Sequence, residues 1–342
     1  MHWARTMRHG VAVAALGLLP MLAPTAGAGA THDPGRTYEV VDLGVLPGGI
    51  SSQGNAINDD GVVVGSSDLG DMVSHAFLSR DGRMTDLGTL VGPSGSSEAN
   101  DLNDRGVVVG ASSAADGGYH PTMWLDGRIV DLGTLGGPFG RATGVNDRGD
   151  VVGFSETATG ETHAFRWQRG RMTDLGTVPG QGFSRAEAVD AEGRAVGESG
   201  GAVVWRHDEP ALLPLVTGAD SAAALDTNDR GTIVGYSLMP GGASINRAVM
   251  WRHGMATDLG LERGSSQAHG VNDRGQVVGT REVEPLTSSG PFLWEDGHVT
   301  MLPALGGGQG GGATGINDGG VIVGSSPDPS NLGSVGHAVV WR

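Results

Sequence analysis

Three sets of residues in this chain have types and spacings that could support chemistry. The segment Gly197-Glu198-Ser199-Gly200-Gly201 fits the pattern Gly-x-Ser-x-Gly, which surrounds the serine nucleophile of many hydrolases. Acidic turns of the form Asn-Asp-x-Gly recur along the chain and offer oxygen ligands of the kind that bind calcium. Imidazoles, which bind zinc and other metals, recur at one position of a repeated segment: His75, His120, His163 and His337.

The setting of these residues argues against catalysis and against a metal. Ser199 stands near where other copies of the repeat also have serine, and no helix follows it, as a nucleophile elbow requires. The four histidines belong to different copies, so they cannot all come within about 2 Å of one ion, and we expect each to support a neighbouring strand. Each acidic turn supplies one Asn and one Asp, fewer carboxylates than a calcium loop of the Asp-x-Asp-x-Asp-Gly type. The sequence therefore predicts no catalytic residue, no metal and no cofactor, with calcium at the turns as the alternative.

The acidic turn belongs to a repeat that covers most of the chain. Its seven copies are 45, 43, 44, 38, 44 and 45 residues apart, and each is followed by an apolar stretch and a glycine. They start at Asn58, Asn103, Asn146, Asp190, Asn228, Asn272 and Asn317, and the fourth copy, Asp190 to Gly193, is degraded. A tryptophan keeps one register in the later copies: Trp124, Trp167, Trp205, Trp251, Trp294 and Trp341.

Each repeat contains four short strand patterns joined by turn residues. In the third copy these are 141–145, 151–155, 163–167 and 171–175. Asn-Asp-x-Gly between the first two strands is a hairpin signal with glycine in the left-handed position. Four strands in about 43 residues is the length of a β-propeller blade, whereas helical repeats would show a different periodicity.

The two ends of the chain complement each other. Residues 38–44 read as a fourth strand with no repeat before it, and Trp341-Arg342 ends a third strand with nothing after it. The sequence therefore predicts an all-β fold, a seven-bladed β-propeller with four antiparallel strands per blade, closed by the N-terminal strand completing the last blade. We expect residues 38–342 to form a single domain.

The repeat resembles that of secreted bacterial proteins built from the HAF repeat, named for a His-Ala-Phe triplet. The triplet is intact at His75-Ala76-Phe77 and His163-Ala164-Phe165 and stands as His337-Ala338-Val339 in the last copy. Four copies depart from it: His120-Pro121-Thr122, Gly201-Ala202-Val203, Arg247-Ala248-Val249 and Gly290-Pro291-Phe292. The resemblance covers residues 38–342 and implies an extracellular repeat scaffold, but it carries no activity, substrate or catalytic residue.

The N-terminal segment has the features of a secretory signal peptide. Arg5 and Arg8 precede a short apolar stretch in residues 1–30, and small residues allow cleavage near Ala28 or Ala30. The apolar stretch is about 12 residues where a membrane span needs roughly 20, so we expect no membrane span and an extracellular location, with 31–37 as a short linker. The absence of cysteine from the 342 residues excludes disulfides and thiol chemistry.

The net charge narrows the range of partners. The formal charge is −16, and removal of residues 1–30 with their two arginines makes it −18. Such a surface repels nucleic acid and anionic membranes. We expect a soluble monomer with no nucleic-acid partner.

Loop length gives the main functional asymmetry. The connections between strands one and two and between strands three and four are tight, whereas the others share the opposite face and vary. They cover 68–74, 114–119, 156–162, 238–246, 281–289 and 327–336 within repeats and 92–97, 136–140, 179–184 and 306–312 between repeats. Variable loops on a constant scaffold are typical of binding surfaces, although weakly constrained loops would also vary. The aromatic and cationic residues there are the candidate binding residues: Tyr119, Phe139, Arg141, Phe183, Arg185 and Tyr236.

These observations predict a secreted, non-catalytic scaffold whose variable face binds an extracellular glycan or protein. One alternative is an extracellular enzyme acting on glycans or peptides, which as a glycosidase would need two carboxylates about 5 to 10 Å apart. The other is a passive structural component of the cell envelope.

Overall fold

The computed structural model describes residues 36–70, 73–240, 245–261, 264–283, 288–328 and 336–342. They form 28 strands and one short 3-10 turn, η1 (Leu305–Gly307), which confirms the all-β class. All of them lie in one compact unit, His32–Arg342. The predicted signal peptide, 1–30, lies outside the described residues with its cleavage sites, as does most of the linker 31–37. No helix in the described ranges is long and apolar enough to span a membrane.

Repeats 1 to 6 each form four antiparallel strands that pair in chain order. Repeat 1 contains β2 (Ser52–Ile57), β3 (Val63–Asp68), β4 (Ser74–Arg80) and β5 (Arg83–Asp86). Repeat 2 contains β6 (Ser97–Leu102), β7 (Val108–Ser113), β8 (Tyr119–Leu125) and β9 (Arg128–Asp131). Repeat 3 contains β10 (Gly136–Val145), β11 (Val151–Thr157), β12 (Thr162–Gln168) and β13 (Arg171–Gly176).

The next three repeats follow the same plan. Repeat 4 contains β14 (Arg185–Val189), β15 (Ala195–Glu198), β16 (Ala202–Arg206) and β17 (Glu209–Leu212). Repeat 5 contains β18 (Ser221–Thr227), β19 (Ile233–Met239), β20 (Ile245–Arg252) and β21 (Met255–Asp258). Repeat 6 contains β22 (Ser266–Val271), β23 (Val277–Val283), β24 (Ser288–Glu295) and β25 (His298–Met301).

Repeat 7 takes its fourth strand from the start of the chain. It contains β26 (Gly312–Ile316), β27 (Ile322–Pro327) and β28 (Gly336–Trp341), and β1 (Val40–Gly44) pairs antiparallel with β28. Residues 136–140, which the sequence predicts as a loop, belong instead to β10. Backbone pairing with Thr157 on β11 and with Tyr119 on β8 extends this strand.

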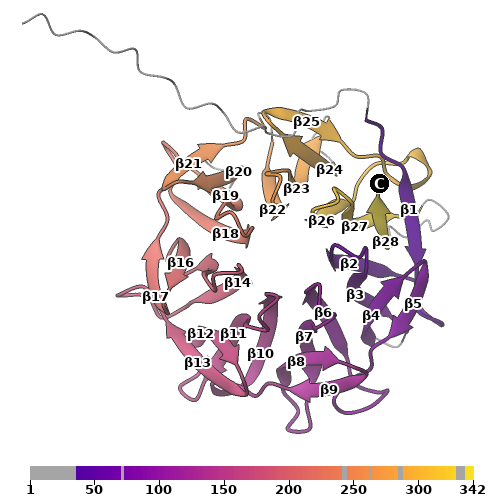
Figure 1. Ribbon diagram of the computed structural model, residues 1–342, viewed down its shortest axis with the longest axis vertical. Helices are drawn as coiled ribbons and strands as arrows, with labels where there is room; N and C mark the ends of the chain where they lie inside the picture. The colour runs from indigo at the N-terminus through magenta and orange to yellow at the C-terminus, as the bar shows by residue number, and fades with distance from the viewer. Residues whose placement is uncertain (1–35, 71–72, 241–244, 262–263, 284–287, 329–335) are drawn as a thin grey trace, which may run out of the picture. The chain divides into compact units, whose positions relative to one another are not determined.

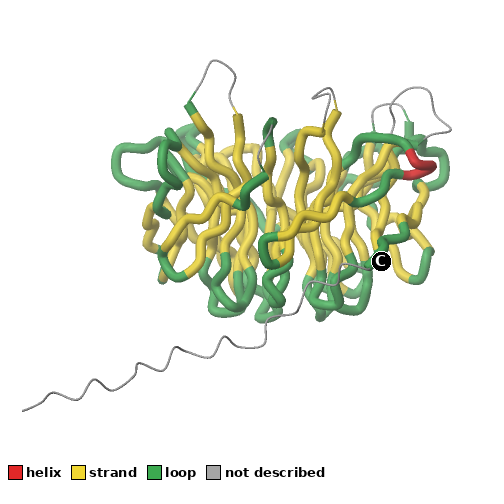
Figure 2. Tube along the Cα trace, turned by 90° about the horizontal axis from the view of Figure 1, so that it is seen from above, coloured by secondary structure: helices red, strands yellow, loops and turns green. Residues whose placement is uncertain are grey.

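The sheets stand around a common centre, with the first strand of each repeat innermost (Figure 1). The innermost strands contact one another in sequence, from β2 through β6, β10, β14, β18 and β22 to β26, and β26 contacts β2 again. The strands run between two ends at which the loops gather (Figure 2). We call the end with the Asn-Asp turns the turn face and the opposite end, with the variable connections, the loop face.

Glycine after the apolar stretch is required by a close backbone approach. A bulge in the first strand of each repeat, such as the one between Ala99 and Asp101, brings that strand against the second strand. A Cβ atom on Gly110 would lie 2.0 Å from the Glu98 carbonyl oxygen, and one on Gly65 would lie 1.9 Å from that of Gln53. No side chain fits there, which explains part of the glycine content.

The hydrophobic core lies between neighbouring repeats rather than within them. Val152 and Ala164 of repeat 3 pack in one buried cluster with Ala186 and Trp205 of repeat 4. Equivalent clusters join the other neighbouring repeats, and one of them joins repeat 7 to repeat 1 through Val323 and its neighbours. Each repeat is therefore stabilised by burial against the next one, as in other repeat proteins.

Side-chain hydrogen bonds join the repeats at the turn face. Asn103 Oδ1 accepts from the N–H groups of Arg105 and Val107, which holds its own turn, while Nδ2 donates to the Asn146 carbonyl oxygen over 2.9 Å. Six of the seven repeats make this donation to the next repeat: Asn58, Asn103, Asn146, Asn228, Asn272 and Asn317, the last to Asn58. The turn motif therefore joins repeats as well as strands.

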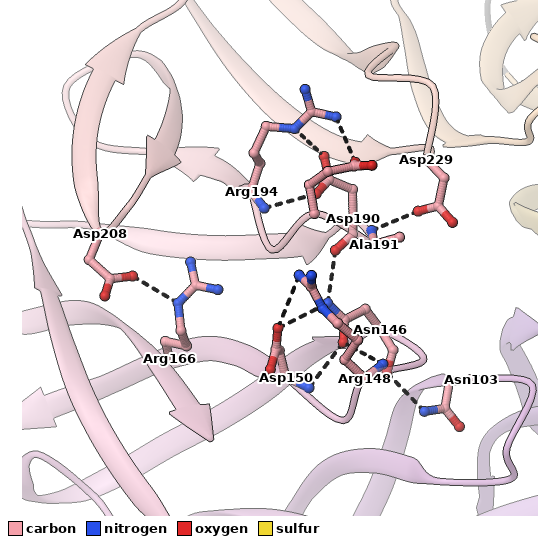
Figure 3. Close-up of polar contacts among 11 residues, drawn as sticks. Asn103, Asn146, Arg148, Asp150, Arg166, Asp190, Ala191, Arg194, Asp208 and Asp229 are labelled. Carbon is pink, nitrogen blue, oxygen red and sulfur yellow. Dashed lines mark hydrogen bonds and ion pairs between the residues drawn. The ribbon is translucent and has the colours of Figure 1, made fainter. Parts of the chain in front are cut away.

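Repeat 4 lacks this donation. The Asp190 side chain has no amide N–H group, and its carboxylate instead accepts from Arg194 Nε over 2.6 Å (Figure 3). Ala191 replaces the aspartate whose carboxylate, in other repeats, accepts the N–H of the preceding turn. Its own N–H still donates to Asp229 Oδ1. Each of the two junctions of repeat 4 therefore lacks one of the regular bonds between turns.

Candidate functional site

Ser199 is a structural residue. Its side chain is fully buried, with 0% of its surface exposed. Its hydroxyl accepts from the Val178 N–H over 3.0 Å and donates to the Phe183 carbonyl oxygen over 2.9 Å. Serines at the same register bind the corresponding loop N–H groups, as Ser67 does for Leu46. Because backbone groups occupy the Ser199 hydroxyl both as donor and as acceptor, the Gly-x-Ser-x-Gly segment does not present a nucleophile.

The repeated histidines pair with the aspartates of the Asp-Leu-Gly motif on the adjacent strand, which confirms their predicted structural role. In repeat 3, His163 Nδ1 lies 2.8 Å from Asp174 Oδ2, and Asp174 Oδ1 also accepts from the Gly176 N–H. The same side-chain hydrogen bond joins His75 to Asp86, His120 to Asp131 and His337 to Asp42, and Arg247 replaces histidine opposite Asp258. Repeats 4 and 6 lack both partners, with Gly201 and Leu212 in one and Gly290 and Met301 in the other.

The acidic turns surround a hollow of about 210 Å3 at the turn face. Their carboxylates accept backbone N–H groups across the junctions, as Asp104 does from Asp59. Partial burial raises the pKa of Asp104 and of Asp273, and the neighbouring aspartates raise it further. In the ranges that the structure describes, no group of three or more His, Asp or Glu side chains is placed to hold a metal ion.

A larger cavity, of about 590 Å3, lies at the centre of the innermost strands. Every repeat contributes to its lining, from the loop face inward. Ligand sites typically have volumes of about 300–1,000 Å3, so the cavity could hold a small molecule or one end of a larger one. The sequence predicted a binding surface made of loops, whereas this site is made of strands.

Aliphatic side chains separate this cavity from the hollow at the turn face. They stand immediately before each turn, and the ones that line both spaces are Ile57, Val145, Val189, Val271 and Ile316. We call these five residues the collar. The collar marks the end of the cavity nearer the turn face, and the mouth lies at the other end, toward the loop face.

The repeats differ most in chemistry at the mouth of the cavity. The position five residues before each turn, called here the mouth position, is occupied by Gln53, Glu98, Arg141, Arg185, Ala223, Gln267 and Gly312. On the adjacent strand, the residues opposite them are Ser66, Ala111, Phe154, Glu198, Tyr236, Thr280 and Ser325. Charged and aromatic residues thus gather on repeats 2 to 5, and small or uncharged polar residues on repeats 6, 7 and 1.

Two ion pairs lie at the charged side of the mouth. Glu98 Oε1 is 2.7 Å from Arg141 Nε, and Glu187 Oε1 is 2.5 Å from Arg185 Nη2. The Arg185 guanidinium also lies over the Phe154 ring, 5.1 Å from its centre. Burial raises the pKa of Glu98 and of Glu187, and the arginine beside each carboxylate limits the rise.

Two tyrosines flank the ion pairs. Burial raises the pKa of Tyr119, the Glu98 carboxylate raises it further and Arg141 opposes the rise. Burial likewise raises the pKa of Tyr236, with Glu198 as the next cause. Both phenols therefore interact electrostatically with charged groups of the mouth.

Of the six predicted binding residues, two line this cavity, and Tyr119, Phe139, Phe183 and Tyr236 do not. Arg141 and Arg185 line the cavity. Phe139, 51% exposed, lies opposite Tyr119 across a strand pair, and Phe183, 40% exposed, precedes β14. The variable segments 71–72, 241–244, 284–287 and 329–335 lie outside the described residues.

Two aspartates lie deeper, two residues before the turns of repeats 2 and 5. Asp101 Oδ2 accepts from the Val145 N–H and Asp226 Oδ2 from the Val271 N–H, each over 2.8 Å and each in the next repeat. Burial raises the pKa of each to about 7, and the Asp226 charge adds to the rise at Asp101. Both line the cavity. The other repeats have small residues there: Ala56, Gly144, Ala188, Gly270 and Gly315.

Glu98, Glu187, Asp101 and Asp226 are not among the residues that the sequence predicts. Each stands where other copies have residues of a different character, so a column-by-column comparison of the first strands would have found them. Loop length, the signal used instead, does not report on a site lined by strands.

No model of a known protein family matches the sequence, and no curated protein does. Among solved structures, a puromycin-hydrolysing peptidase of Mycobacterium tuberculosis matches with a TM-score of 0.53 and 15% identity, over 82% of this chain and 49% of that chain. The β-propeller domain of the Trilobed protease from Pyrococcus furiosus matches with a TM-score of 0.47 and 9% identity, over 86% of this chain and 96% of that chain.

TolB from Acinetobacter baumannii matches with a TM-score of 0.42 and 14% identity, over 76% of this chain and 55% of that chain. This chain spans about half the length of TolB and of the peptidase. At these identities the likeness concerns fold alone. The four-stranded antiparallel sheets, which stand around a common centre with their first strands innermost, have the architecture of a β-propeller scaffold.

Proposed function

We propose that this protein is an exported, seven-bladed β-propeller that binds an extracellular ligand in its central cavity without transforming it. The blade count is supported by seven sequence repeats, each with four paired strands. Closure is supported by the pairing of β1 with β28 and by the contact of β26 with β2. Closure through β1 also leaves repeat 7 without an unpaired outer strand.

Export is supported by the sequence of residues 1–30 and by the resemblance to the HAF repeat. Both indicate an extracellular location. The resemblance adds a scaffold without an assigned activity, which agrees with a binding role. A direct check is the N-terminal sequence of protein recovered from the culture medium, where cleavage near Ala28 or Ala30 is expected.

The observation that carries the binding proposal is the divergence of the repeats at the mouth. Seven copies of one strand keep their framework residues, yet the mouth position changes from glutamine to glutamate to arginine to alanine. A position that served only packing would repeat with the others. Residues that differ between repeats, face a cavity and carry charge are typical of recognition.

The test is incubation of the purified full chain with cell-wall and exopolysaccharide fractions, with both retention and product release measured. Binding without turnover gives retention of the protein and an unchanged fraction. Absence of retention on every fraction would contradict the proposal and favour a passive envelope component.

A hydrolytic enzyme is the second candidate, because Asp101 and Asp226 are electrostatically coupled carboxylates in one cavity. Carboxylates with raised pKa values serve as general acids in glycoside hydrolysis. If the protein were such an enzyme, products would appear during incubation and disappear in Asp101→Asn and Asp226→Asn variants. That result would replace the binding role with catalysis.

A further inference from the structure

The ligand class follows from how the charges of the mouth are arranged, given the binding function proposed above. We propose that the cavity takes the terminal one to three units of a neutral saccharide chain, which enters end-on from the loop face beside repeats 2 to 4. Three features support this: arginines already paired with carboxylates, exposed phenylalanines two residues before the mouth positions of repeats 3 and 4, and the aliphatic collar.

The ion pairs favour an uncharged, hydroxyl-rich ligand. Each arginine of the mouth already lies beside a carboxylate, at 2.7 Å for Arg141 and Glu98 and 2.5 Å for Arg185 and Glu187. A charged ligand group would have to displace one partner and leave the other with an unmatched charge, which is costly in a partly buried site. A sugar hydroxyl can donate to a carboxylate and accept from a guanidinium at once. It therefore adds hydrogen bonds without separating either pair.

The aromatic groups suit the apolar face of a sugar ring. Phe139 and Phe183 are 51% and 40% exposed, whereas Phe77 and Phe165 in the core are fully buried. Exposed rings at the edge of a polar cavity provide flat contact area at little cost in conformational entropy. They stand before the mouth positions of repeats 3 and 4, the repeats that supply both arginines.

The collar determines how a chain can enter. Ile57, Val145, Val189, Val271 and Ile316 line both the cavity and the hollow beneath it, so a polar chain that threaded through would have to pass these five aliphatic side chains. Burying its hydroxyl groups there without partners would cost about 1–3 kcal/mol for each group. The chain therefore stops at the collar, and a volume of about 590 Å3 limits entry to its terminal units.

The first test is a length series measured by isothermal titration calorimetry with the full chain. The probes are oligomers of one to six units of β-1,4-glucose, β-1,4-N-acetylglucosamine and α-1,4-glucose, with uncharged and charged peptides of similar length in parallel. End-on binding predicts that the affinity for one saccharide series rises up to two or three units and then stays constant. An affinity that keeps rising to six units would overturn end-on entry, and preferential binding of a peptide would overturn the ligand class.

The second test uses variants at the mouth. Arg185→Ala and Arg141→Ala should each weaken saccharide binding about tenfold or more. Arg185→Lys should weaken it nearly as much, since lysine keeps the charge but loses the planar pair of donors. Full retention of binding in Arg185→Lys would indicate recognition by charge and would contradict a neutral ligand.

The matched control is Arg230→Ala. Arg230 is 72% exposed on the turn face, with Nε 3.8 Å from Asp273, and its loss should leave binding within about twofold. Melting temperatures of all variants check that the fold is kept. Retention on cell-wall fractions without saccharide binding would end this inference and leave the binding function standing, whereas absence of any retention would end both.

Discussion

The two ends of the innermost strands serve different purposes although they belong to the same segments of chain. At the turn face, six of seven repeats present the same asparagine, and each donates to the next repeat. At the mouth position, near the loop face, no such uniformity exists. A residue that bonds the neighbouring repeat must keep a hydrogen-bond donor in each copy, whereas one that faces the cavity is free to differ in charge and size. Framework and recognition are therefore separated along a single strand.

Repeat 4 shows that the two purposes can conflict. Three residues before the turn, Asn55, Asn100, Thr143, His269 and Thr314 each donate to a carbonyl oxygen of the next repeat. Glu187 holds that position in repeat 4, and as a carboxylate it cannot donate; it pairs with Arg185 instead. With Asp190 at the turn, the junction of repeats 4 and 5 loses two of the regular bonds. The repeat that contributes most charge to the mouth is also the one with the weakest framework.

The largest effect is expected from removal of β1, the strand from the start of the chain that pairs with β28 of repeat 7. Deletion of residues 31–44 removes β1, with the half-buried Val40, Val41 and Leu43, from β28. Loss of these apolar contacts should cost about 3–5 kcal/mol, a large share of a total stability of about 5–15 kcal/mol. Thermal unfolding measures it, with a deletion of residues 31–35 as the control. An unchanged melting temperature would rule out closure through β1.

The asparagine bonds can be broken in a regular repeat and restored in the irregular one. Asn103→Ala removes the donation to Asn146 and leaves the N–H groups of Arg105 and Val107 without their acceptor. We expect a loss of about 2–4 kcal/mol in urea unfolding. Asp190→Asn supplies the missing donor but loses the ion pair with Arg194, so its effect should stay within about 1 kcal/mol. Equal losses of unfolding free energy in Asn103→Ala and Asp190→Asn would contradict the view that the asparagine stabilises repeat 2 while repeat 4 does without it.

The buried aspartates of the cavity should make stability depend on pH. Because the pKa of Asp101 and Asp226 is raised to about 7, the folded protein binds more protons than the unfolded chain between about pH 4 and pH 7. The unfolding free energy should therefore fall as pH rises through this range, by about 1–3 kcal/mol. The double variant Asp101→Asn, Asp226→Asn should lose this component in urea unfolding at a series of pH values. An unchanged slope would place both carboxylates in a more hydrated setting.

The smallest effect is expected at the histidines, although they define the repeat motif. His163→Ala removes one ion pair with Asp174, whose side chain is 41% exposed. Partly exposed pairs contribute about 0.2–1 kcal/mol, and repeats 4 and 6 fold without one. Chemical denaturation should show a change below about 1 kcal/mol. A change as large as that of Asn103→Ala would mean that the pair supports the framework directly.

The strands could be predicted from the sequence because turn residues recur at fixed positions. The pairing of β1 with β28 could also be predicted, from the unmatched strand patterns at the two ends. The cavity could not be predicted in this way. The bulge between Ala99 and Asp101 disturbs the alternation of faces, so Asn100 and Asp101 both line the cavity. The approach of Glu98 to Arg141 also depends on the angle between repeats, which no local pattern encodes. Residue type alone was enough to suggest candidate residues such as Arg141 and Arg185, whereas their arrangement around the cavity could be seen only in the structure.

The six asparagine bonds all run in one direction, from one repeat to its successor and from Asn317 back to Asn58. Such a head-to-tail interface joins unlike surfaces of identical units, and it closes only when the rotation per unit divides the circle. Duplication or loss of one unit of about 44 residues in the gene would keep every type of bond and change only that rotation. The interface is therefore a means by which rings with a different number of repeats could arise from this chain without any new contact.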